Sequence, residues 1–307
     1  MSALQWCDWS CTVRVVLADG RPADETPDRT TAARVERLVR DLMDDVARSA
    51  SRFRPDSDLS RVNAGSGRLL PVRRLTLELV EVALHAARRT DGACDPTVGR
   101  PLLAAGYDAD IDTLRARGAS VDRRPCARAD WTRVRVDREL GRLGVPAGLA
   151  LDLGATTKAW TADEAAVRLT RAVGTPALVA LGGDVAVSGS GQAWPVLVSE
   201  HEGGPGEVVT LVGGGIATSS TRGRRWATSD GERHHVIDPR TGVPTDGTVR
   251  TASVLAPSCV EANTFSTAAL VWGSDAPALL EPRAARLVDA TGTVVTTAGW
   301  PRSQVAA

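Results

Sequence analysis

Apolar side chains recur at helical spacing in several long segments of the chain. In residues 30–50, the apolar positions from Val35 to Val46 follow each other at steps of three and one, which makes a single stripe. Thr30 or Thr31 is expected to cap this helix. Apolar stretches predict three more long helices and a short one, over residues 75–90, 157–173, 260–272 and Ile111–Arg117.

Short apolar runs between these helices indicate strands, and several are joined by glycine-rich turns. The predicted strands cover residues 11–18, 176–188, 194–199, 207–212, 234–237, 249–255 and 286–298. Helices and strands do not alternate regularly, and strands predominate in the C-terminal half, so the order predicts an α+β fold. We treat residues 1–307 as a single domain, with a loose connection near 118–130, where Gly, Pro and Arg gather.

Composition narrows the class of protein further. The formal net charge is +0, so no basic field favours nucleic acid or an anionic membrane surface. No apolar stretch approaches the roughly 18–20 residues that span a bilayer, and the N-terminus does not resemble a signal peptide. The 5 cysteines are odd in number and scattered, which favours a reduced, cytoplasmic protein over a disulfide framework.

The common catalytic motifs are absent from the sequence. It has no G-x-x-x-x-G-K-[ST] loop, no G-x-G-x-x-G after a strand and no G-x-S-x-G elbow, so a P-loop kinase, a Rossmann dehydrogenase and an α/β-hydrolase are disfavoured. Dense polar segments remain as the candidate sites. They cover residues 51–63, 91–99, 151–160, 181–184 and 213–242.

Each segment also has an ordinary structural interpretation. The first fits a capped turn after a helix, and the second a loop in which Asp95 is held extended by Pro96. The third places Lys158, the only lysine of the chain, at the start of a helix, where backbone N–H groups favour anions. The fourth, Leu-Gly-Gly-Asp, suits either a tight turn or close approach of the backbone to a ligand.

The fifth segment combines glycines, hydroxyl side chains and arginines, which suit phosphate oxygens. Arg222, Arg224 and Arg225 follow the glycine turn, although solvated arginines are the ordinary alternative. His234 and His235 stand side by side, and neighbours on a strand face opposite ways. We therefore expect only one of the two histidines to face a site.

Taken together and in order, these segments resemble the ApbE family of FAD:protein FMN transferases over nearly the whole chain. Residues 51–63 are similar to S-R-[FY]-x-x-x-S-x-[LI]-S-x-[LFV]-N, and residues 91–99 to G-A-F-D-P-T-V-G. Residues 151–160 are similar to D-L-G-G-I-A-K-G-Y-A. Residues 181–184 and 237–242 match the family's Leu-Gly-Gly-Asp and Ile-Asp-Pro-Arg-Thr-Gly as they stand.

The resemblance implies a fold and a flavin site. The fold is a T-fold-related α+β architecture, with mixed sheets packed against helices and two lobes around an FAD site. Cys94 departs from the motif, because the family has an aromatic residue there. The positions that fall on FAD-contacting motifs are Phe53, Ala93, Cys94, Asp95, Asp152, Lys158 and Ile237.

The resemblance also implies a Mg²⁺ ion, held by the backbone near Ala155 and by a C-terminal helix. The family's A-D-A-x-[AD]-T-A is altered in that helix: Asn263 replaces an aspartate, Ser266 stands where some members carry a second one, and Thr267 is retained. Positions 263 and 267 are one helical turn apart and share a face. Mg²⁺ prefers anionic oxygens, so we expect weaker binding than with an aspartate.

The implied reaction cleaves FAD and attaches FMN to a threonine or serine of an acceptor flavoprotein or FMN-binding domain, releasing AMP. Lys158 and Mg²⁺ would neutralise the pyrophosphate, and His235 or a carboxylate would take the acceptor proton. Asn63 is the third candidate catalytic residue. Two alternatives stay open, an FAD pyrophosphatase that releases FMN and AMP, and a non-catalytic FAD-binding protein with an impaired metal site.

Overall fold

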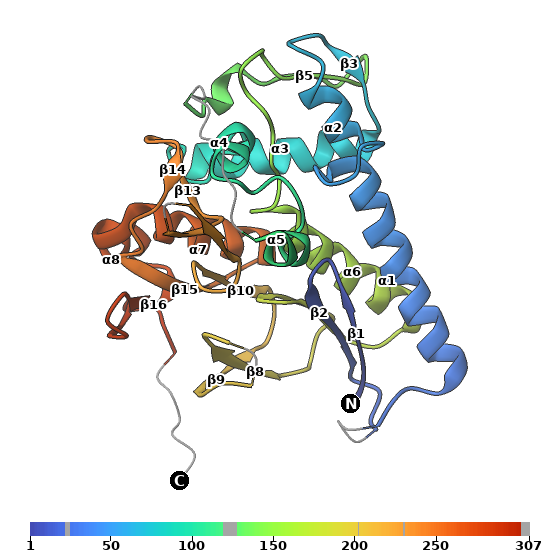
Figure 1. Cartoon of the computed structure of the whole chain (residues 1–307). Coiled ribbons are helices and arrows are strands. Elements are labelled where there is room, and N and C mark those ends of the chain that lie inside the picture. The colour runs from blue at the N-terminus through green and yellow to red at the C-terminus, as the bar shows by residue number, and fades with distance from the viewer. Residues whose placement is uncertain (22–24, 119–127, 202, 230, 302–307) are drawn as a thin grey trace.

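An eight-stranded antiparallel sheet organises the part of the chain that the structure describes (Figure 1). The computed structural model describes residues 1–21, 25–118, 128–201, 203–229 and 231–301. The strand order is β1-β2-β6-β7-β10-β15-β16-β17. These strands are Ser2–Asp8 (β1), Cys11–Leu17 (β2), Ala177–Leu181 (β6), Asp184–Ser188 (β7), Gly215–Ser220 (β10), Val249–Ala256 (β15), Ala284–Asp289 (β16) and Val294–Thr296 (β17).

Helices cover one face of this sheet, and smaller strand groups complete the fold. The helices are Arg29–Ala50 (α1), Asp58–Asn63 (α2), Arg74–Arg89 (α3), Gly99–Ala104 (α4), Ile111–Arg117 (α5), Thr157–Val173 (α6), Cys259–Trp272 (α7) and Ala276–Leu280 (α8), with 3-10 turns at Trp131–Arg133 and Gly273–Asp275. The smaller strands are Leu70–Pro71 (β3), Arg135–Asp137 (β4), Arg142–Gly144 (β5), Trp194–Ser199 (β8), Gly206–Leu211 (β9), Arg225–Thr228 (β11), Gly231–His234 (β12), Ile237–Asp238 (β13) and Val243–Pro244 (β14).

Both faces of the sheet are covered by a hydrophobic core. Because side chains alternate along extended backbone, neighbouring residues of one strand join different cores. On β2, Val13 and Val15 join the larger core with α1, α3 and α6, whereas Val16 packs in a second core on the other face. The β8–β9 hairpin closes that second core (Figure 1). No described helix is long and apolar enough to cross a membrane.

The predicted α+β class is confirmed, and each predicted helix is present within two residues of its expected bounds. The cap of α1 was predicted wrongly. Asp28 precedes the helix, and its carboxylate accepts hydrogen bonds from the backbone N–H groups of Thr30 and Thr31. A carboxylate one turn ahead thus makes the two threonines donors instead of caps.

Three predicted strands are wrong in detail. Residues 176–188 and 286–298 are each two strands joined by a turn, because Gly182-Gly183 and the Asp289 loop reverse the chain. The strand expected at 234–237 is interrupted, since the Val236 N–H donates to Nδ1 of the His234 ring. The loose connection expected near 118–130 falls largely on residues 119–127, outside the described residues.

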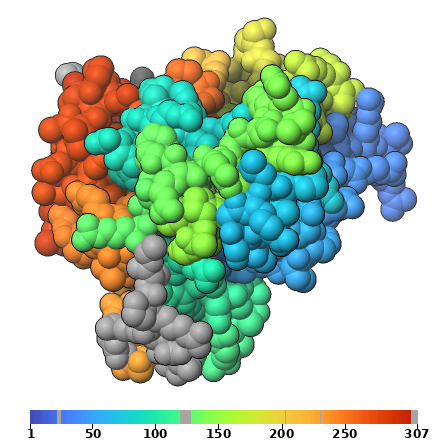
Figure 2. Space-filling model, turned by 90° about the horizontal axis from the view of Figure 1, so that it is seen from above, coloured from blue at the N-terminus to red at the C-terminus, as the bar shows by residue number. Residues whose placement is uncertain are grey.

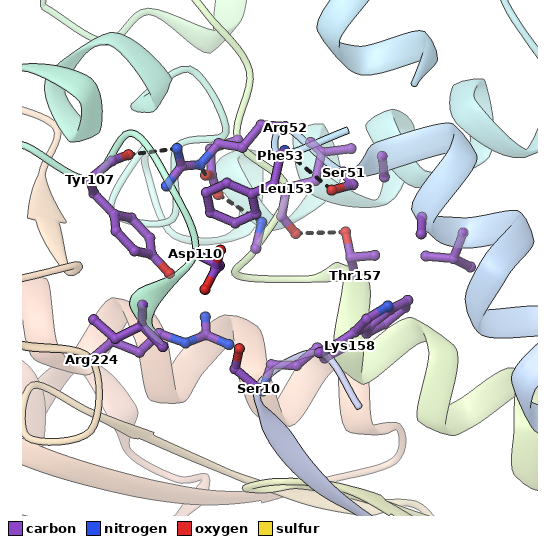
Figure 3. A pocket seen from close by; sticks show the side chains of 17 residues that line it. Ser10, Ser51, Arg52, Phe53, Tyr107, Asp110, Leu153, Thr157, Lys158 and Arg224 are labelled. Atoms are coloured by element: carbon purple, nitrogen blue, oxygen red, sulfur yellow. Dashed lines mark hydrogen bonds and ion pairs between the residues drawn. The ribbon is translucent and has the colours of Figure 1, made fainter. Parts of the chain in front are cut away.

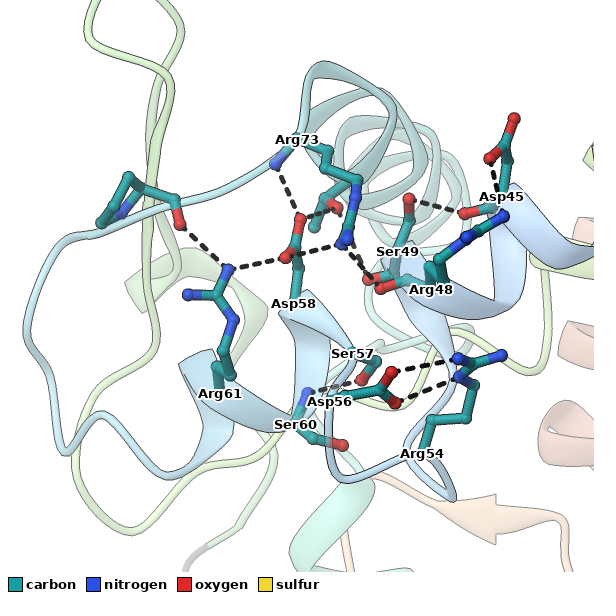
Figure 4. Close-up of polar contacts among 12 residues, drawn as sticks. Asp45, Arg48, Ser49, Arg54, Asp56, Ser57, Asp58, Ser60, Arg61 and Arg73 are labelled. Carbon is teal, nitrogen blue, oxygen red and sulfur yellow. Dashed lines mark hydrogen bonds and ion pairs between the residues drawn. The ribbon is translucent and has the colours of Figure 1, made fainter.

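A polar corner joins α1, α2 and α3 around Asp58, and we call it the Asp58 corner (Figure 4). Its carboxylate accepts hydrogen bonds from Arg61 Nη2 at 2.6 Å, from the Arg73 backbone N–H at 2.7 Å and from Thr76 Oγ1 at 2.8 Å. Ser57 caps α2 through the Ser60 N–H. Much of the polar segment 51–63 is therefore used to build this junction.

Candidate functional site

Two adjoining hollows of about 200 and 390 Å³ open beside α6, and we call them together the cleft. Seen from above, segments of the first, middle and last thirds of the chain lie side by side on one face (Figure 2). The hollows share part of their lining, so they form one continuous space. The shared lining residues are Ser10, Phe53, Tyr107, Ile111, Asp152, Gly154, Lys158 and Arg224.

Aromatic rings and a guanidinium form one wall of the cleft (Figure 3). Phe53 meets Tyr107 edge to face at 5.7 Å, and Tyr107 stacks on Trp226 at 5.1 Å. The Arg52 guanidinium lies 4.2 Å from the Phe53 ring centre and 4.4 Å from the Tyr107 ring centre. Phe53 stays 43% exposed, so its ring is available to stack on a planar ligand.

Asp152 is held beneath this wall by partners on both sides. Arg52 Nε donates to its Oδ2 at 2.5 Å, and the Gly154 N–H donates to its Oδ1 at 2.8 Å. Arg52 Nη2 is buried without a hydrogen-bond partner among the described residues. That donor and the exposed Phe53 ring leave the wall with unused binding capacity on the cleft side.

Asn63 lies at the end of α2 and does not line the cleft in the described part of the chain. Its Nδ2 donates to the Leu151 carbonyl at 2.9 Å, and its Oδ1 accepts from the Leu151 N–H at 2.8 Å. Both polar atoms of its side chain are thus occupied by the residue before Asp152. The arrangement links Asn63 to the backbone that positions Asp152.

Lys158 reaches into the cleft from the first turn of α6. Its ammonium lies 2.8 Å from Asp184 Oδ2, and the Asp184 side chain is only 2% exposed. Asp184 follows a sharp turn at Gly182 and Gly183. A Cβ at Gly183 would stand 2.6 Å from the Thr218 carbonyl oxygen, so only glycine lets β7 and β10 approach this closely.

The two adjacent histidines face different surroundings, as expected from their alternation. His235 lines the cleft, and its Nδ1 is buried without a partner among the described residues. Desolvation, with Arg224, His234 and Lys158 nearby, lowers the pKa of His235 well below its ordinary value. Burial therefore favours the neutral imidazole, in which one ring nitrogen keeps an unprotonated lone pair. The Nε2 of His234 instead faces the Thr245 carbonyl at 3.1 Å.

The motif at 91–99 contributes a buried shelf to the cleft. Ala93, Cys94 and Asp95 line it together with Ile237 from β13. Burial raises the pKa of the Cys94 thiol to about 12, so the thiol is not a nucleophile. Burial also raises the pKa of Asp95, although its carboxylate accepts hydrogen bonds from both Thr97 donors.

The predicted metal-binding residues divide into two groups. Ala155, Asn263 and Thr267 line the cleft, and Thr267 Oγ1 lies 3.4 Å from Asn263 Oδ1. Ser266 is fully buried and does not line the described cleft, but it bonds at 2.8 Å to Ser219, which does. Among the described residues, no group of three or more His, Cys, Asp or Glu side chains is arranged to hold a metal.

The donor set nevertheless fits a cation that is shared with substrate phosphates. Asn263 and Thr267 offer neutral oxygens, and Asp184 Oδ1 lies 2.5 Å from Asn263 Nδ2. Mg²⁺ is bound in many enzymes by one or two carboxylates plus substrate phosphates. The cleft provides that kind of incomplete, all-oxygen shell and not a closed metal cage.

Several lining residues were not assigned a role from the sequence. Arg52 was obscured among many arginines, and Asp184 was noted only as the end of a glycine turn, whereas Arg224 was expected to suit phosphate oxygens and does line the cleft. Tyr107 is the only tyrosine of the chain, which is the one signal that pointed to it. Arg222 and Arg225, expected with Arg224, do not line the cleft in the described part of the chain.

The chain matches known proteins over most of its length. The FAD:protein FMN transferase of Klebsiella pneumoniae strain 342 is 28% identical over 260 residues, covering 81% of this chain and 74% of that protein. The Treponema pallidum protein of the same name is 30% identical over 243 residues, covering 72% and 66%.

Solved structures of the same family share the fold. The ApbE protein of Thermotoga maritima aligns at a TM-score of 0.81 and 23% identity, covering 96% of each chain. The flavinyl transferase ApbE of Pseudomonas stutzeri aligns at 0.77 and 24% identity, covering 97% of this chain and 95% of that one. The ApbE family model matches residues 8–289. This protein therefore belongs to the ApbE family.

Proposed function

We propose that this protein is an FAD:protein FMN transferase. It would cleave the pyrophosphate of FAD and join FMN through a phosphoester to a threonine or serine of an acceptor protein. The observation that carries the proposal is one cleft that holds an aromatic wall, two cationic side chains and an unprotonated histidine. Relatives over most of the chain that bear this enzyme name support it.

The isoalloxazine ring and the pyrophosphate of FAD each have a matching surface in the cleft, with FAD bound between two lobes. The isoalloxazine ring would stack on Phe53, whose exposed face is bordered by Tyr107 and Arg52. The pyrophosphate would lie between Lys158 and Arg224, which both line the cleft opposite that wall (Figure 3). We also place flavin contacts at Ala93, Cys94, Asp95, Asp152 and Ile237.

The transfer balances without an added oxidant or reductant. The acceptor hydroxyl oxygen attacks the phosphorus of the FMN half, and the bond from that phosphorus to the bridging oxygen breaks. AMP leaves with the bridging oxygen, and the hydroxyl proton passes to His235, which is held neutral in the cleft. Lys158 stabilises the charge that grows on the leaving phosphate. We propose that Asn63 acts by positioning Asp152 through Leu151.

A bound Mg²⁺ would supply charge neutralisation of the pyrophosphate. Asn263, Thr267 and the backbone near Ala155 are the residues that we propose to hold it from the protein side. Ser266 would support the site indirectly, because its hydroxyl accepts or donates to Ser219, which in turn contacts Thr267 at 3.1 Å.

The test is a flavin-transfer assay with purified protein, FAD, Mg²⁺ and an FMN-binding acceptor domain. We expect a covalently fluorescent acceptor on a denaturing gel and AMP in equal amount by chromatography. Omitting the acceptor distinguishes a transferase from an FAD pyrophosphatase, because only the pyrophosphatase releases FMN and AMP when no acceptor is present. FAD that binds and stays intact with and without acceptors would leave only a flavin-binding protein and would refute the proposal.

We propose a cytoplasmic flavoprotein as the acceptor. All four described cysteines are free thiols, which supports a reducing compartment. Flavin labelling of a lysate, followed by mass spectrometry of the fluorescent band, would identify the acceptor. Labelling of an exported or periplasmic protein alone would contradict the location.

A further inference from the structure

The cleft face of α7 carries no charge where it would meet a cation. Asn263 and Thr267 present an amide and a hydroxyl, and Ser266 is buried and does not line the described cleft. Neutral oxygens alone hold Mg²⁺ weakly, because much of its binding energy comes from anionic ligands. A carboxylate from another element is needed if the cation is to be bound as the proposed function requires.

Five carboxylates line the described part of the cleft, and four of them are already used or lie elsewhere. Asp110 caps α5, because its side chain accepts hydrogen bonds from the backbone N–H groups of Asp112 and Thr113. Asp95 is occupied by Thr97, and Asp152 is paired with Arg52. Asp112 is exposed and bonds to Ser10 at 3.5 Å. None of these four contacts α7 through a hydrogen bond or ion pair found among the described residues.

Asp184 is the fifth carboxylate, and it touches α7 directly. Its Oδ1 lies 2.5 Å from Asn263 Nδ2, and its residue is 1% exposed at the start of β7. Asn263 Oδ1 in turn faces Thr267 Oγ1 at 3.4 Å. The three side chains thus form a continuous set of oxygens between β7 and α7.

We propose that Asp184 is the carboxylate that this chain offers to the divalent cation, in place of the charge that Asn263 lacks. The inference rests on the proposed function and adds a residue from the sheet to a site otherwise built on the helix. The distance of 2.5 Å between Asp184 Oδ1 and Asn263 Nδ2 places this carboxylate directly beside the helix position that lacks a charge. Asp184 and Asn263 together offer a cation one negative charge. An aspartate at 263 beside an asparagine at 184 would offer the same charge.

Lys158 explains how Asp184 can be buried before the cation arrives. An isolated buried carboxylate is costly, and the Lys158 ammonium at 2.8 Å compensates it. With a cation and the pyrophosphate bound, the Lys158 ammonium would be free to leave Asp184 and to contact a phosphate oxygen. The same lysine then serves both states of the cleft.

The experiment measures Mn²⁺ binding by electron paramagnetic resonance, with FAD present and no acceptor. Asp184→Asn should weaken Mn²⁺ binding by about tenfold or more, since one charge-assisted ligand is lost. The charge swap Asp184→Asn/Asn263→Asp should restore binding to within about threefold of the parent. Asp112→Asn removes a charge from the same cleft and should leave the Mn²⁺ affinity unchanged.

Parent-like affinity in Asp184→Asn, or a charge swap as weak as that single variant, would overturn the proposal. Crystals of the parent with Mn²⁺ and FAD give a second test that does not depend on a folded variant. The anomalous peak should lie against the Asp184 carboxylate, and a peak held by Asn263 and Thr267 alone would also overturn it. These readouts need no flavin transfer, so failure of the proposed function would be seen separately.

Discussion

Asp58 and Asp184 are both buried aspartates, but they differ in what lies beyond their partners. Asp58 is 2% exposed and Asp184 is 1% exposed. The donors around Asp58 come from the Asp58 corner itself, and none of them is among the described residues that line the cleft. The partners of Asp184 are Lys158 and Asn263, and both line the cleft.

The difference shows that a dense polar motif is not in itself a site. Within residues 51–63, Arg52 and Phe53 face the cleft, whereas Asp58 serves the packing of three helices. Burial opposes ionisation of Asp58, but hydrogen bonds from Arg73, Arg61 and Thr76 outweigh it and hold its pKa below the ordinary value. The charge of Asp58 stabilises the packing of the helices, whereas the charge of Asp184 faces a space that a ligand can enter.

The largest expected effect is on the cleft side of the comparison. His235→Gln should lower the transfer rate by about 10²–10⁴-fold, because the proposed proton acceptor is lost. The FAD dissociation constant and the unfolding midpoint should change little. Stopped-flow or quenched assays with FAD and acceptor measure the rate. His234→Gln is the matched control and should keep most of the parent rate, and equal losses in both variants would contradict the assignment.

The next effect belongs to the Asp58 corner. Asp58→Asn should lower the free energy of unfolding by about 2–3 kcal/mol, since several charge-assisted hydrogen bonds are weakened at once. Urea titration followed by circular dichroism measures the change. FAD affinity of the folded variant should match the parent, and a loss of affinity without a loss of stability would place Asp58 in the site. Asp56→Asn, an exposed neighbour, should leave the unfolding midpoint unchanged.

Asn63 connects the two regions, so its removal should affect both to a smaller extent. Asn63→Ala leaves the Leu151 N–H and carbonyl without their side-chain partner. We expect a loss of about 1–2 kcal/mol in unfolding free energy, together with weaker FAD binding by fluorescence titration. Ser60→Ala, on the same helix, is the control. Parent-like FAD binding in Asn63→Ala would show that Asp152 is positioned without it.

The smallest expected effect is a rate that does not change with pH. Because the pKa of His235 is lowered, its imidazole stays neutral throughout this pH range. The transfer rate should therefore be the same at pH 8 as at pH 6.5, which is the ordinary pKa of histidine. With an unshifted pKa, half of the base would be protonated at pH 6.5. A plot of rate against pH checks this, and a halved rate at pH 6.5 would contradict the environment described for His235.

Acid should lower the free energy of unfolding through Asp58 and through His235 in different pH ranges. Because the folded pKa of Asp58 is lowered, its contribution is present above the ordinary value of 3.8 and is lost as pH falls below it. For His235 the folded pKa is also lowered, so its penalty begins once pH falls below 6.5. The unfolding midpoint of Asp58→Asn should therefore approach that of the parent as pH falls below 3.8, whereas the midpoint of His235→Gln should rise above that of the parent once pH falls below 6.5.

The sequence by itself determined the family, the class of fold and most of the lining of the cleft. Helical stripes such as that of α1 depend on local periodicity, and motifs such as residues 151–160 keep their order along the chain. Phe53, Asp152, Lys158 and His235 were therefore found before their positions in space were known.

Only the tertiary structure decided which polar residues are used for packing and which face the cleft. Nothing local distinguishes Asp58 from Asp184, because their roles depend on partners at distant positions, such as Thr76 and Asn263. Likewise, Asn63 lies in a motif associated with binding, but its side chain forms hydrogen bonds with the backbone of Leu151. Hydrogen bonds between residues far apart in the sequence leave no local sequence pattern. These bonds decide whether a buried charge stabilises the fold or faces the cleft.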